Sequence, residues 1–332
     1  MNRAGTWVRL TRPFTLAPPL LGVVSGAITA WGSAHNPHVL AGETRVWTAA
    51  ILVSIGIGSA CAAVMNGASN IFNQIFDLEN DRINKPHRPL VTGAASTAEA
   101  WALLSVLYVL SLVPTWWVTV YPLESWSERT FAPPIAHEVF WIYLAGILFT
   151  WIYSAPAFGR TKQNAYLAGL TMAIPRGCLL KVAGWGMVAS VFHVEPWYIG
   201  FVFFLFILGA SATKDFSDMK GDAEAGCRTL PIRYGVVAAA RMIAPFFILP
   251  WLLVPLGVWL PDPLAPGEPI LTGNPTLLIG LGVILALWGV YAVRLILRDP
   301  QALAESENHP SWTHMYSMMM FAQVGFAAAY LL

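Results

Sequence analysis

Two short segments hold a large share of the acidic side chains of this chain. Seven of its eighteen Asp and Glu residues lie in 73–81 and 215–224, and each segment follows a long apolar run. Carboxylates are costly near hydrocarbon and mark functional sites there. Oxygen donors without His or Cys favour Mg²⁺, which shares its coordination shell with substrate phosphates. The two segments therefore predict one Mg²⁺ centre that is built from both and binds an anionic ligand.

In the first segment and the run before it, polar residues recur at the spacing of one helical face. Asn66, Asn70, Asn73, Asp77 and Asp81 are four, three, four and four positions apart, which predicts a single stripe of oxygen ligands. The axial rise from Asn73 to Asp81 is about 12 Å, too far for one ion but suited to a ladder of metal and diphosphate contacts. Asn66 and Asn70 alone are also typical of hydrogen bonds between membrane helices.

The acidic residues of the second segment also recur at helical spacing. Asp218 and Asp222 are four positions apart, and Asp215 lies three positions before Asp218, so the three carboxylates can share a helical face. Gly221 and Gly226 should loosen or end this helix. Cationic side chains that would suit an anionic ligand accompany both segments, namely Lys85, Arg88 and Lys214.

The composition predicts an all-α integral membrane protein. Of its 332 residues, 56% are hydrophobic and 11% are charged, against roughly 25% charged in soluble domains. Nine apolar runs reach the length of about 20 residues that spans a bilayer. They lie at 15–33, 47–72, 97–121, 138–155, 164–190, 197–213, 234–257, 276–296 and 312–332. We expect one domain, 1–332, with these helices around a central cavity.

The order of the spans predicts two parallel repeats of four helices, about 1–155 and 156–300, plus a ninth helix. An even number of spans separates the acidic segments, so both lie on one side of the membrane. The positive-inside rule makes that side cytoplasmic, with the N-terminus inside, because only Arg45 and Arg129 of the loop cations then remain outside. A prokaryotic plasma membrane is the simplest location. No basic tail suggests nucleic acid.

Two strings of the sequence resemble the signatures of a known family. NQIFDLENDRINKPHRPLVTG and KDFSDMKGDAEAGCRTLPIRYG resemble the N-x-x-x-D-x-x-x-D and D-x-x-x-D motifs of the UbiA superfamily of intramembrane prenyltransferases. Nine helices with these motifs after the second and sixth also look like that family. The resemblance implies that Mg²⁺ ions and an isoprenoid diphosphate are held by Asn73, Asp77, Asp81, Asp218 and Asp222, with Asp215 a further participant. The catalytic carboxylates would be Asp77, Asp81, Asp218 and Asp222.

Further residues are assigned to substrate binding. Tyr153 and Ser154 resemble the family's Tyr-Ser element, Arg160 and Lys162 its basic loop, and Arg12 is a weaker match. Asn70 extends the first polar stripe. Arg176 and Lys181 lie within the fifth span, where unpaired charge is costly, so we expect both to face the cavity and contact the acceptor or the diphosphate. Pro175 is expected to kink that helix.

These features predict Mg²⁺-dependent transfer of a prenyl group from a prenyl diphosphate to a small acceptor, with release of pyrophosphate. A side opening to membrane lipid would admit the prenyl tail. We favour an aromatic acceptor of the quinone or heteroaromatic type. The second motif is more similar to homogentisate, chlorophyllide and geranylgeranylglyceryl phosphate transferases, so chlorophyllide or a lipid alcohol is an alternative. A secondary transporter also has parallel repeats, but here the acids end helices at one membrane face.

Overall fold

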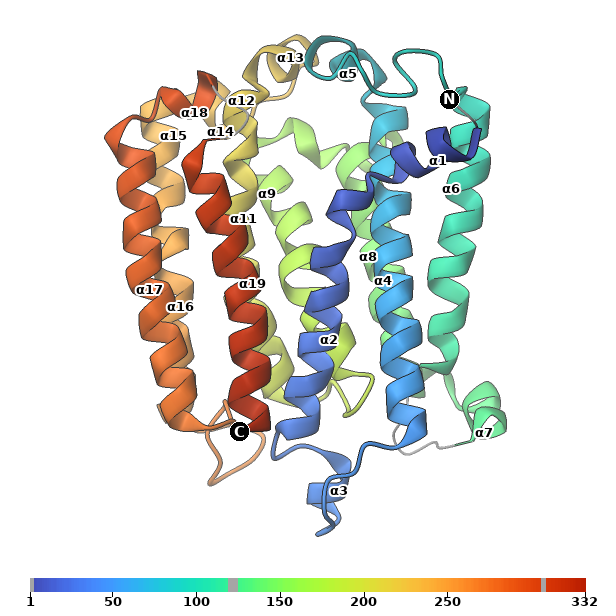
Figure 1. Cartoon of the computed structure of the whole chain (residues 1–332), viewed down its shortest axis with the longest axis vertical. Coiled ribbons are helices and arrows are strands. Elements are labelled where there is room, and N and C mark those ends of the chain that lie inside the picture. Colours follow the sequence, from blue (N-terminus) through green and yellow to red (C-terminus); the bar gives the residue numbers. More distant parts are fainter. Residues whose placement is uncertain (1–2, 119–124, 306–308) are drawn as a thin grey trace.

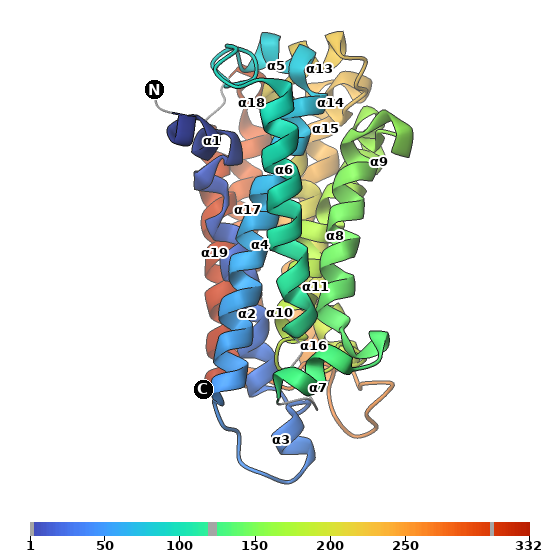
Figure 2. The same cartoon turned by 90° about the vertical axis from the view of Figure 1, so that its right-hand side faces the viewer.

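The computed structural model describes residues 3–118, 125–305 and 309–332, and this part of the chain folds as an all-helical bundle (Figure 1). The long helices run side by side along one direction, and short helices cap both ends of the bundle (Figure 2). This architecture confirms the all-α membrane fold that the composition predicts.

The bundle consists of α-helices and of short 3-10 or π-helical segments, which are labelled η. In chain order, the first half contains α1 (Arg3–Thr11), η1 (Pro13–Thr15), α2 (Ala17–Gly32), α3 (Pro37–Leu40), α4 (Ala49–Phe76), α5 (Leu78–Asn84), α6 (Thr97–Leu112), η2 (Val113–Trp117), α7 (Trp126–Phe131), η3 (Pro134–Ala136), α8 (Glu138–Ser154), η4 (Pro156–Phe158) and η5 (Thr161–Gln163). The second half contains α9 (Ala165–Ala173), η6 (Ile174–Leu179), α10 (Leu180–Trp185), α11 (Val194–Ala212), α12 (Lys214–Ser217), α13 (Met219–Glu224), α14 (Leu230–Tyr234), α15 (Val236–Ile243), η7 (Ala244–Phe247), α16 (Leu249–Trp259), α17 (Pro275–Arg298), α18 (Ala302–Glu305) and α19 (Pro310–Leu331).

The sequence predicts nine membrane spans, but fewer helices meet strict criteria of length and hydropathy for crossing a membrane. Within the described residues, six helices are long and apolar enough to cross a membrane, or seven if the bent pair Arg3–Thr15 and Ala17–Leu40 forms one span. The predicted span at 138–155 corresponds to α8, which is apolar but has 17 residues. The predicted span at 312–332 corresponds to α19, which is not among the six. The end of the predicted span 97–121 lies outside the described residues.

Two of the predicted spans are interrupted by proline. Pro175 lies in the π-helical segment η6 between α9 and α10, and Pro245 lies in the 3-10 segment η7 between α15 and α16. Proline has no backbone N–H and its ring clashes with the preceding turn, so it removes a hydrogen bond of the α-helical ladder and favours a local distortion. The expected distortion at Pro175 is confirmed, and it takes the form of a π-helical turn.

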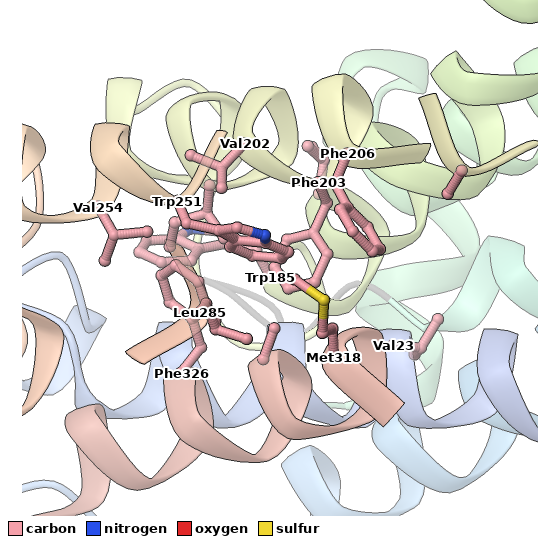
Figure 3. Close-up of a cluster of buried hydrophobic side chains, with 14 of the residues drawn as sticks. Val23, Trp185, Val202, Phe203, Phe206, Trp251, Val254, Leu285, Met318 and Phe326 are labelled. Atoms are coloured by element: carbon pink, nitrogen blue, oxygen red, sulfur yellow. The ribbon is translucent and has the colours of Figure 1, made fainter. Parts of the chain in front are cut away.

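Large aromatic side chains fill the interior where α10, α11, α16 and α19 meet (Figure 3). Trp185, Phe203, Trp251 and Phe326 are almost fully buried. The ring centroids of Phe206 and Trp251 are 4.9 Å apart, and those of Phe203 and Phe326 are 5.6 Å apart. Such pairs contribute about 0.5–1.5 kcal/mol beyond the burial of their area. This cluster joins the C-terminal helices to the middle of the chain.

Helices α2 and α10 approach so closely that glycine is required at their contact. A Cβ at Gly184 would collide with the carbonyl oxygen of Val23, and one at Gly26 would collide with that of Lys181. Small residues allow membrane helices this close approach. The contact packs α2, near the N-terminus, against α10, the helix that follows the π-helical segment η6.

We predict that Gly184→Ala lowers the stability of the purified protein by about 1–3 kcal/mol, because the added methyl group pushes two backbones apart. The matched control is Gly56→Ala in α4, where a Cβ meets no atom within 4 Å. The midpoint of thermal unfolding in detergent, followed by size-exclusion chromatography, measures the difference. Equal midpoints for the two variants would show that this glycine contact does not limit stability.

Candidate active site at one end of the bundle

The first acidic segment keeps its helical spacing although the helix breaks within it. Asp77 follows the last residue of α4, with φ −104° and ψ 13°, and α5 begins at the next residue. The Asp77 N–H still donates to the Asn73 carbonyl at 2.8 Å, and the Asp81 N–H donates to the Asp77 carbonyl at 2.7 Å. The predicted uninterrupted stripe is therefore broken at Asp77, but the three metal-type side chains keep their order along the helix axis.

The second acidic segment is built in a similar way. Asp218 lies between α12 and α13, and the Asp222 N–H donates to the Asp218 carbonyl at 3.0 Å. This bond keeps the two carboxylates on successive turns. Gly226 has φ +73° directly after the turn that ends α13, as its predicted helix-ending role requires.

The two acidic segments lie against each other at the same end of the bundle (Figures 1 and 2). The Asn80 amide donates to Asp222 Oδ1 at 2.9 Å. Asn84 accepts from the Gly221 N–H at 3.2 Å and donates to the Asp218 carbonyl at 3.3 Å. These bonds fix α5 against α13, so the carboxylates of both motifs lie close together at one end of the bundle. The sequence pattern alone points to neither asparagine.

Gly221 has a different role from the predicted one. A Cβ at this position would collide with the side chains of Asn80 and Asn84. Gly221 lies inside α13 rather than at its end, and its missing side chain lets α13 pack on α5. The sequence signal for this role is a glycine between two aspartates, and only the fold shows which partner approaches it.

Cationic side chains pair with the carboxylates of both motifs. Asp77 forms an ion pair with Lys162, and its Oδ1 lies 3.9 Å from Arg160 Nη2. Asp81 forms an ion pair with Arg88. These contacts bring η5, the loop after α5 and the first motif together, and the substrate-binding roles of these cations stay a prediction.

Asp218 is held by a cation from each half of the chain. Its Oδ1 lies 3.4 Å from Lys85 Nζ, and its Oδ2 lies 3.2 Å from Lys214 Nζ. Burial raises the pKa of Asp218, but Lys214 and Lys85 together outweigh that effect, so its net pKa is lowered. The Asp218 carboxylate is therefore ionised at neutral pH and available to a cation or to a metal ion.

Burial outweighs the opposing interactions in the pKa of the neighbouring groups. It raises the pKa of Asp81, which is 6% exposed, although Arg88 opposes the shift. Burial also raises the pKa of Asp222, against the hydrogen bond from Asn80. It lowers the pKa of Lys162 to about 8. A divalent cation would favour the ionised form of both carboxylates, because it supplies the charge that the surroundings lack.

A cavity opens directly below the first motif. It has a volume of about 760 Å³ with its open mouth included, and α2, α4, α8, α9, η6 and α10 surround it. Asn73, Tyr153 and Arg176 line this cavity, and apolar side chains such as Met65 and Ile142 line its deeper part. The hydroxyl of Ser154 donates to Asn73 Oδ1 at 2.6 Å. We call this space the first cavity.

Of the remaining predicted site residues, Lys181 is engaged elsewhere and Asp215 lines a different cavity. The Lys181 ammonium donates to Ser25 Oγ at 2.6 Å and lies over the rings of Phe203 and Phe326. Lys181 does not line the first cavity, so the expectation that it faces the cavity is wrong, whereas Arg176 does face it. Asp215 lines a second cavity on the other side of Tyr153.

Asn70 and Arg12 belong to the junction between α1 and α2. The Asn70 amide donates to the Thr11 carbonyl at 2.9 Å and to Thr15 Oγ1 at 2.8 Å. Its side chain therefore holds the N-terminal segment, the interhelical role that its sequence also allows. Arg12 has φ +54° and lies within electrostatic range of Asp81, Arg88 and Arg176. Arg12 thus adds positive charge near the first motif.

The carboxylate donors of the two motifs fit an Mg²⁺ ion that is also coordinated by a phosphate ligand. Within the described ranges, no three Asp, Glu, His or Cys side chains converge closely enough to hold an ion by themselves. Mg²⁺ usually binds one or two carboxylates and completes its shell with water and substrate phosphates. Carboxylate pairs from two facing motifs, with lysine and arginine side chains beside them, match that requirement.

Comparison with known proteins gives the family. The model of the UbiA prenyltransferase family matches residues 20–312. The chain belongs to the UbiA prenyltransferase family. It is 29% identical over 241 residues to digeranylgeranylglyceryl phosphate synthase of Methanocaldococcus jannaschii, a match that covers 70% of this chain and 69% of that protein. It is 26% identical over 234 residues to chlorophyll synthase of Arabidopsis thaliana, a match that covers 70% of this chain and 54% of that protein.

Solved structures of this family share the fold of the chain. A UbiA homologue from Archaeoglobus fulgidus bound to GPP and Mg²⁺ superposes with a TM-score of 0.66 at 18% identity, over 98% of this chain and 100% of the other. A structure of digeranylgeranylglyceryl phosphate synthase superposes with a TM-score of 0.64 at 20% identity, over 100% of this chain and 99% of the other. This UbiA chain thus has the fold of its family.

The contact between α5 and α13 yields a prediction for this UbiA protein. Gly221→Val should separate the two motifs and lower the prenyl transfer rate by about 10²-fold, because small displacements of catalytic groups have effects of that size. Ala223→Val, at an exposed position of the same helix, is the matched control. Pyrophosphate release by the purified proteins measures the effect. Unchanged release in Gly221→Val would contradict the role of this contact.

Proposed function

We propose that this protein transfers a prenyl group from a prenyl diphosphate to a small acceptor in an Mg²⁺-dependent reaction that releases pyrophosphate. The observation that carries the proposal is the hydrogen bond from Asn80 to Asp222, which joins the two acidic motifs at one end of the bundle. Family membership supports prenyl transfer and argues against the secondary transporter considered from the sequence.

The donor diphosphate would lie at the mouth of the first cavity. Asn73, Asp77, Asp81, Asp218 and Asp222 would hold Mg²⁺ against it. The cations around these carboxylates would contact its remaining oxygens, and they are Lys85, Arg88, Arg160, Lys162 and Lys214. In this arrangement each cation exchanges a carboxylate for a phosphate oxygen, so substrate binding leaves no buried cation unpaired.

Ionisation of the allylic C–O bond transfers negative charge to the diphosphate. Bound Mg²⁺ supplies Lewis acidity that stabilises this charge. The fixed cations of the chain add to that stabilisation because they are already oriented before the reaction. Tyr153 and Arg176 line the first cavity below Asn73, where the allylic carbon would lie. The apolar walls beneath them would exclude water from the carbocation and receive the prenyl tail.

The acceptor would attack the allylic carbon and lose a proton to complete the transfer. We favour an aromatic acceptor of the quinone or heteroaromatic type. The relatives named above support the alternative acceptors, chlorophyllide and a lipid alcohol. One relative is a chlorophyll synthase and another is a digeranylgeranylglyceryl phosphate synthase. Arg176 in the first cavity offers a cation to an acceptor phosphate, which supports the lipid phosphate as second candidate.

We also infer nine membrane crossings and a cytoplasmic active site. Helix α8, with 17 residues, rises about 25 Å, and a short span is accommodated by local thinning of the bilayer. Helix α19 has 22 residues and runs beside α2 and α17 (Figure 1). The end with the acidic motifs also carries most loop cations, which the positive-inside rule places in the cytoplasm. In a prokaryote this membrane would be the plasma membrane.

Neutralising one carboxylate in each motif tests the proposal. Asp77→Asn and Asp218→Asn should each lower prenyl transfer by about 10²-fold or more, because each removes charge from the diphosphate site. Glu79→Gln and Glu224→Gln are matched controls, since both acids are exposed on the neighbouring short helices. Membranes with each variant are incubated with GPP, candidate acceptors and Mg²⁺, and pyrophosphate is measured with and without EDTA.

Two results would contradict this assignment. One is transfer at the wild-type rate in both Asp→Asn variants. The other is wild-type transfer that persists after EDTA has removed divalent cations. A fall of the same size in the Glu→Gln controls would show a general loss of folded protein, which the amount of monodisperse protein in detergent reports separately.

A further inference from the structure

The two walls of the first cavity that α4 and α8 form run side by side in a constant register (Figure 2). At the mouth the Ser154 hydroxyl donates to Asn73 Oδ1 at 2.6 Å, and one turn lower the hydroxyls of Ser69 and Thr150 lie 3.0 Å apart. The partners in both pairs are 81 positions apart in the sequence. Because parallel α-helices have the same rise per turn, this offset indicates which residues face each other deeper in the cavity.

The register leads to a level at which the cavity ends. Met65 and Gly146 keep the offset, and a Cβ at Gly146 would lie 3.4 Å from Met65 Sδ. The next pair is Ala62 and Tyr143, which both line the cavity. The Tyr143 hydroxyl donates to the Gly58 carbonyl at 2.7 Å, one turn of α4 below Ala62. The Tyr143 ring therefore crosses from α8 to α4 and forms a floor.

The residues around this floor are tightly packed. Ala62, Tyr143 and Ala183 are 2%, 3% and 1% exposed, although all three line the cavity. A Cβ at Gly58 would collide with the methyl group of Met187, which is itself fully buried. Within the described ranges, the lowest lining residues therefore leave no path to lipid or water at this level. The cavity is blind at the end that lies away from the acidic motifs.

The charge of the lining stays at the mouth. Arg176 lies within electrostatic range of Arg12 and Tyr153, which places its guanidinium near the first motif. Toward the floor the cavity is lined by apolar side chains such as Met65 and Ile142. An apolar tail whose diphosphate is held at the mouth gains burial with each carbon that it adds. This gain ends where the tail reaches the floor.

The depth of the cavity sets the length of the tail that fits. Asn73 and Ala62 are eleven positions apart on α4, and Tyr153 and Ile142 are eleven positions apart on α8. At a rise of about 1.5 Å per residue, both walls are about 16 Å long. An extended carbon chain advances by about 1.2 Å per bond, as the extended peptide backbone does. A tail of two isoprene units then spans about 8 Å, one of three units about 13 Å and one of four units about 18 Å.

We propose that the first cavity selects a prenyl diphosphate with three isoprene units, and that the Tyr143 ring limits the length of its tail. The inference rests on the proposed prenyl transfer and narrows its donor to the farnesyl class. A geranyl tail leaves about 8 Å of the cavity empty. A geranylgeranyl tail meets the Tyr143 ring before its last unit has entered. The tail thus ends inside the protein instead of leaving sideways into lipid.

The binding of three donors of different length tests this limit without an acceptor. GPP, farnesyl diphosphate and geranylgeranyl diphosphate are titrated with Mg²⁺ into the purified protein in one detergent. Dissociation constants are obtained by calorimetry, with the free donor concentration determined by dialysis. Ala62→Leu raises the floor, whereas Ala60→Leu adds the same side chain at an exposed position of α4 that does not line the cavity.

We expect the wild-type protein to bind farnesyl diphosphate at least about tenfold more tightly than either of the other donors, since even one misplaced methylene has an effect of that size. Ala62→Leu should weaken the binding of farnesyl diphosphate by about tenfold or more and leave that of GPP nearly unchanged. Ala60→Leu should alter neither. Comparison of these two variants cancels the partition of each donor into the detergent.

A second pair of variants tests the floor itself. Tyr143→Ala removes the ring, so the affinity for geranylgeranyl diphosphate should rise about tenfold relative to that for farnesyl diphosphate. Tyr143→Phe keeps the ring and loses only the hydrogen bond to Gly58, so the order of the three donors should stay as in the wild type.

Three results would overturn the length limit. They are equal wild-type affinities for farnesyl and geranylgeranyl diphosphate, equal losses in Ala62→Leu and Ala60→Leu, and an unchanged donor order in Tyr143→Ala. Equal wild-type affinities would indicate that the tail leaves the cavity sideways. Failure of all three donors to bind would instead contradict the donor site of the proposed function, so the two kinds of failure are distinguishable.

Discussion

The contact between α5 and α13 is the interaction on which the site depends. Asn80 and Asn84 reach from the first acidic segment to Asp222, Asp218 and Gly221 of the second. These bonds join residues at least 134 positions apart, so they hold the two halves of the bundle at one end. Without them the motifs would be two separate acidic helix ends. With them, oxygen donors of the type that Mg²⁺ prefers are gathered at one end of the bundle.

Charge balance explains how such a cluster is tolerated at the edge of a membrane protein. Lys162, Arg88, Lys85 and Lys214 each pair with a carboxylate of the motifs. A partly buried carboxylate without a partner would cost several kcal/mol. In the proposed function the same cations would contact a diphosphate when metal ions occupy the carboxylates, so one set of side chains would serve both the free and the ligand-bound protein. The cavities beneath have mostly apolar walls, as prenyl chemistry requires.

Much of the site could be predicted because its pattern is local. The four-residue spacing of Asp77 and Asp81, and of Asp218 and Asp222, survives the breaks between short helices. The partners of α5 could not be predicted, since Asn80 and Gly221 meet only through the fold. Arg176 lies in the π-helical segment η6 and Lys181 in α10, so an α-helical spacing could not show which of the two faces the first cavity. The span count is harder to read from sequence because α8 is short, α19 is not among the helices that meet the length and hydropathy criteria, and the first span is bent.

The central claim is that one metal site draws on both motifs. Titration of the protein with Mn²⁺ in the presence of inorganic pyrophosphate, followed by electron paramagnetic resonance, tests it directly. The account predicts that Asp77→Asn and Asp222→Asn each weaken Mn²⁺ binding by about 10–100-fold, and that the double variant loses clearly less than the product of the two single effects. Unchanged Mn²⁺ affinity in either variant, or fully independent effects, would contradict a shared site.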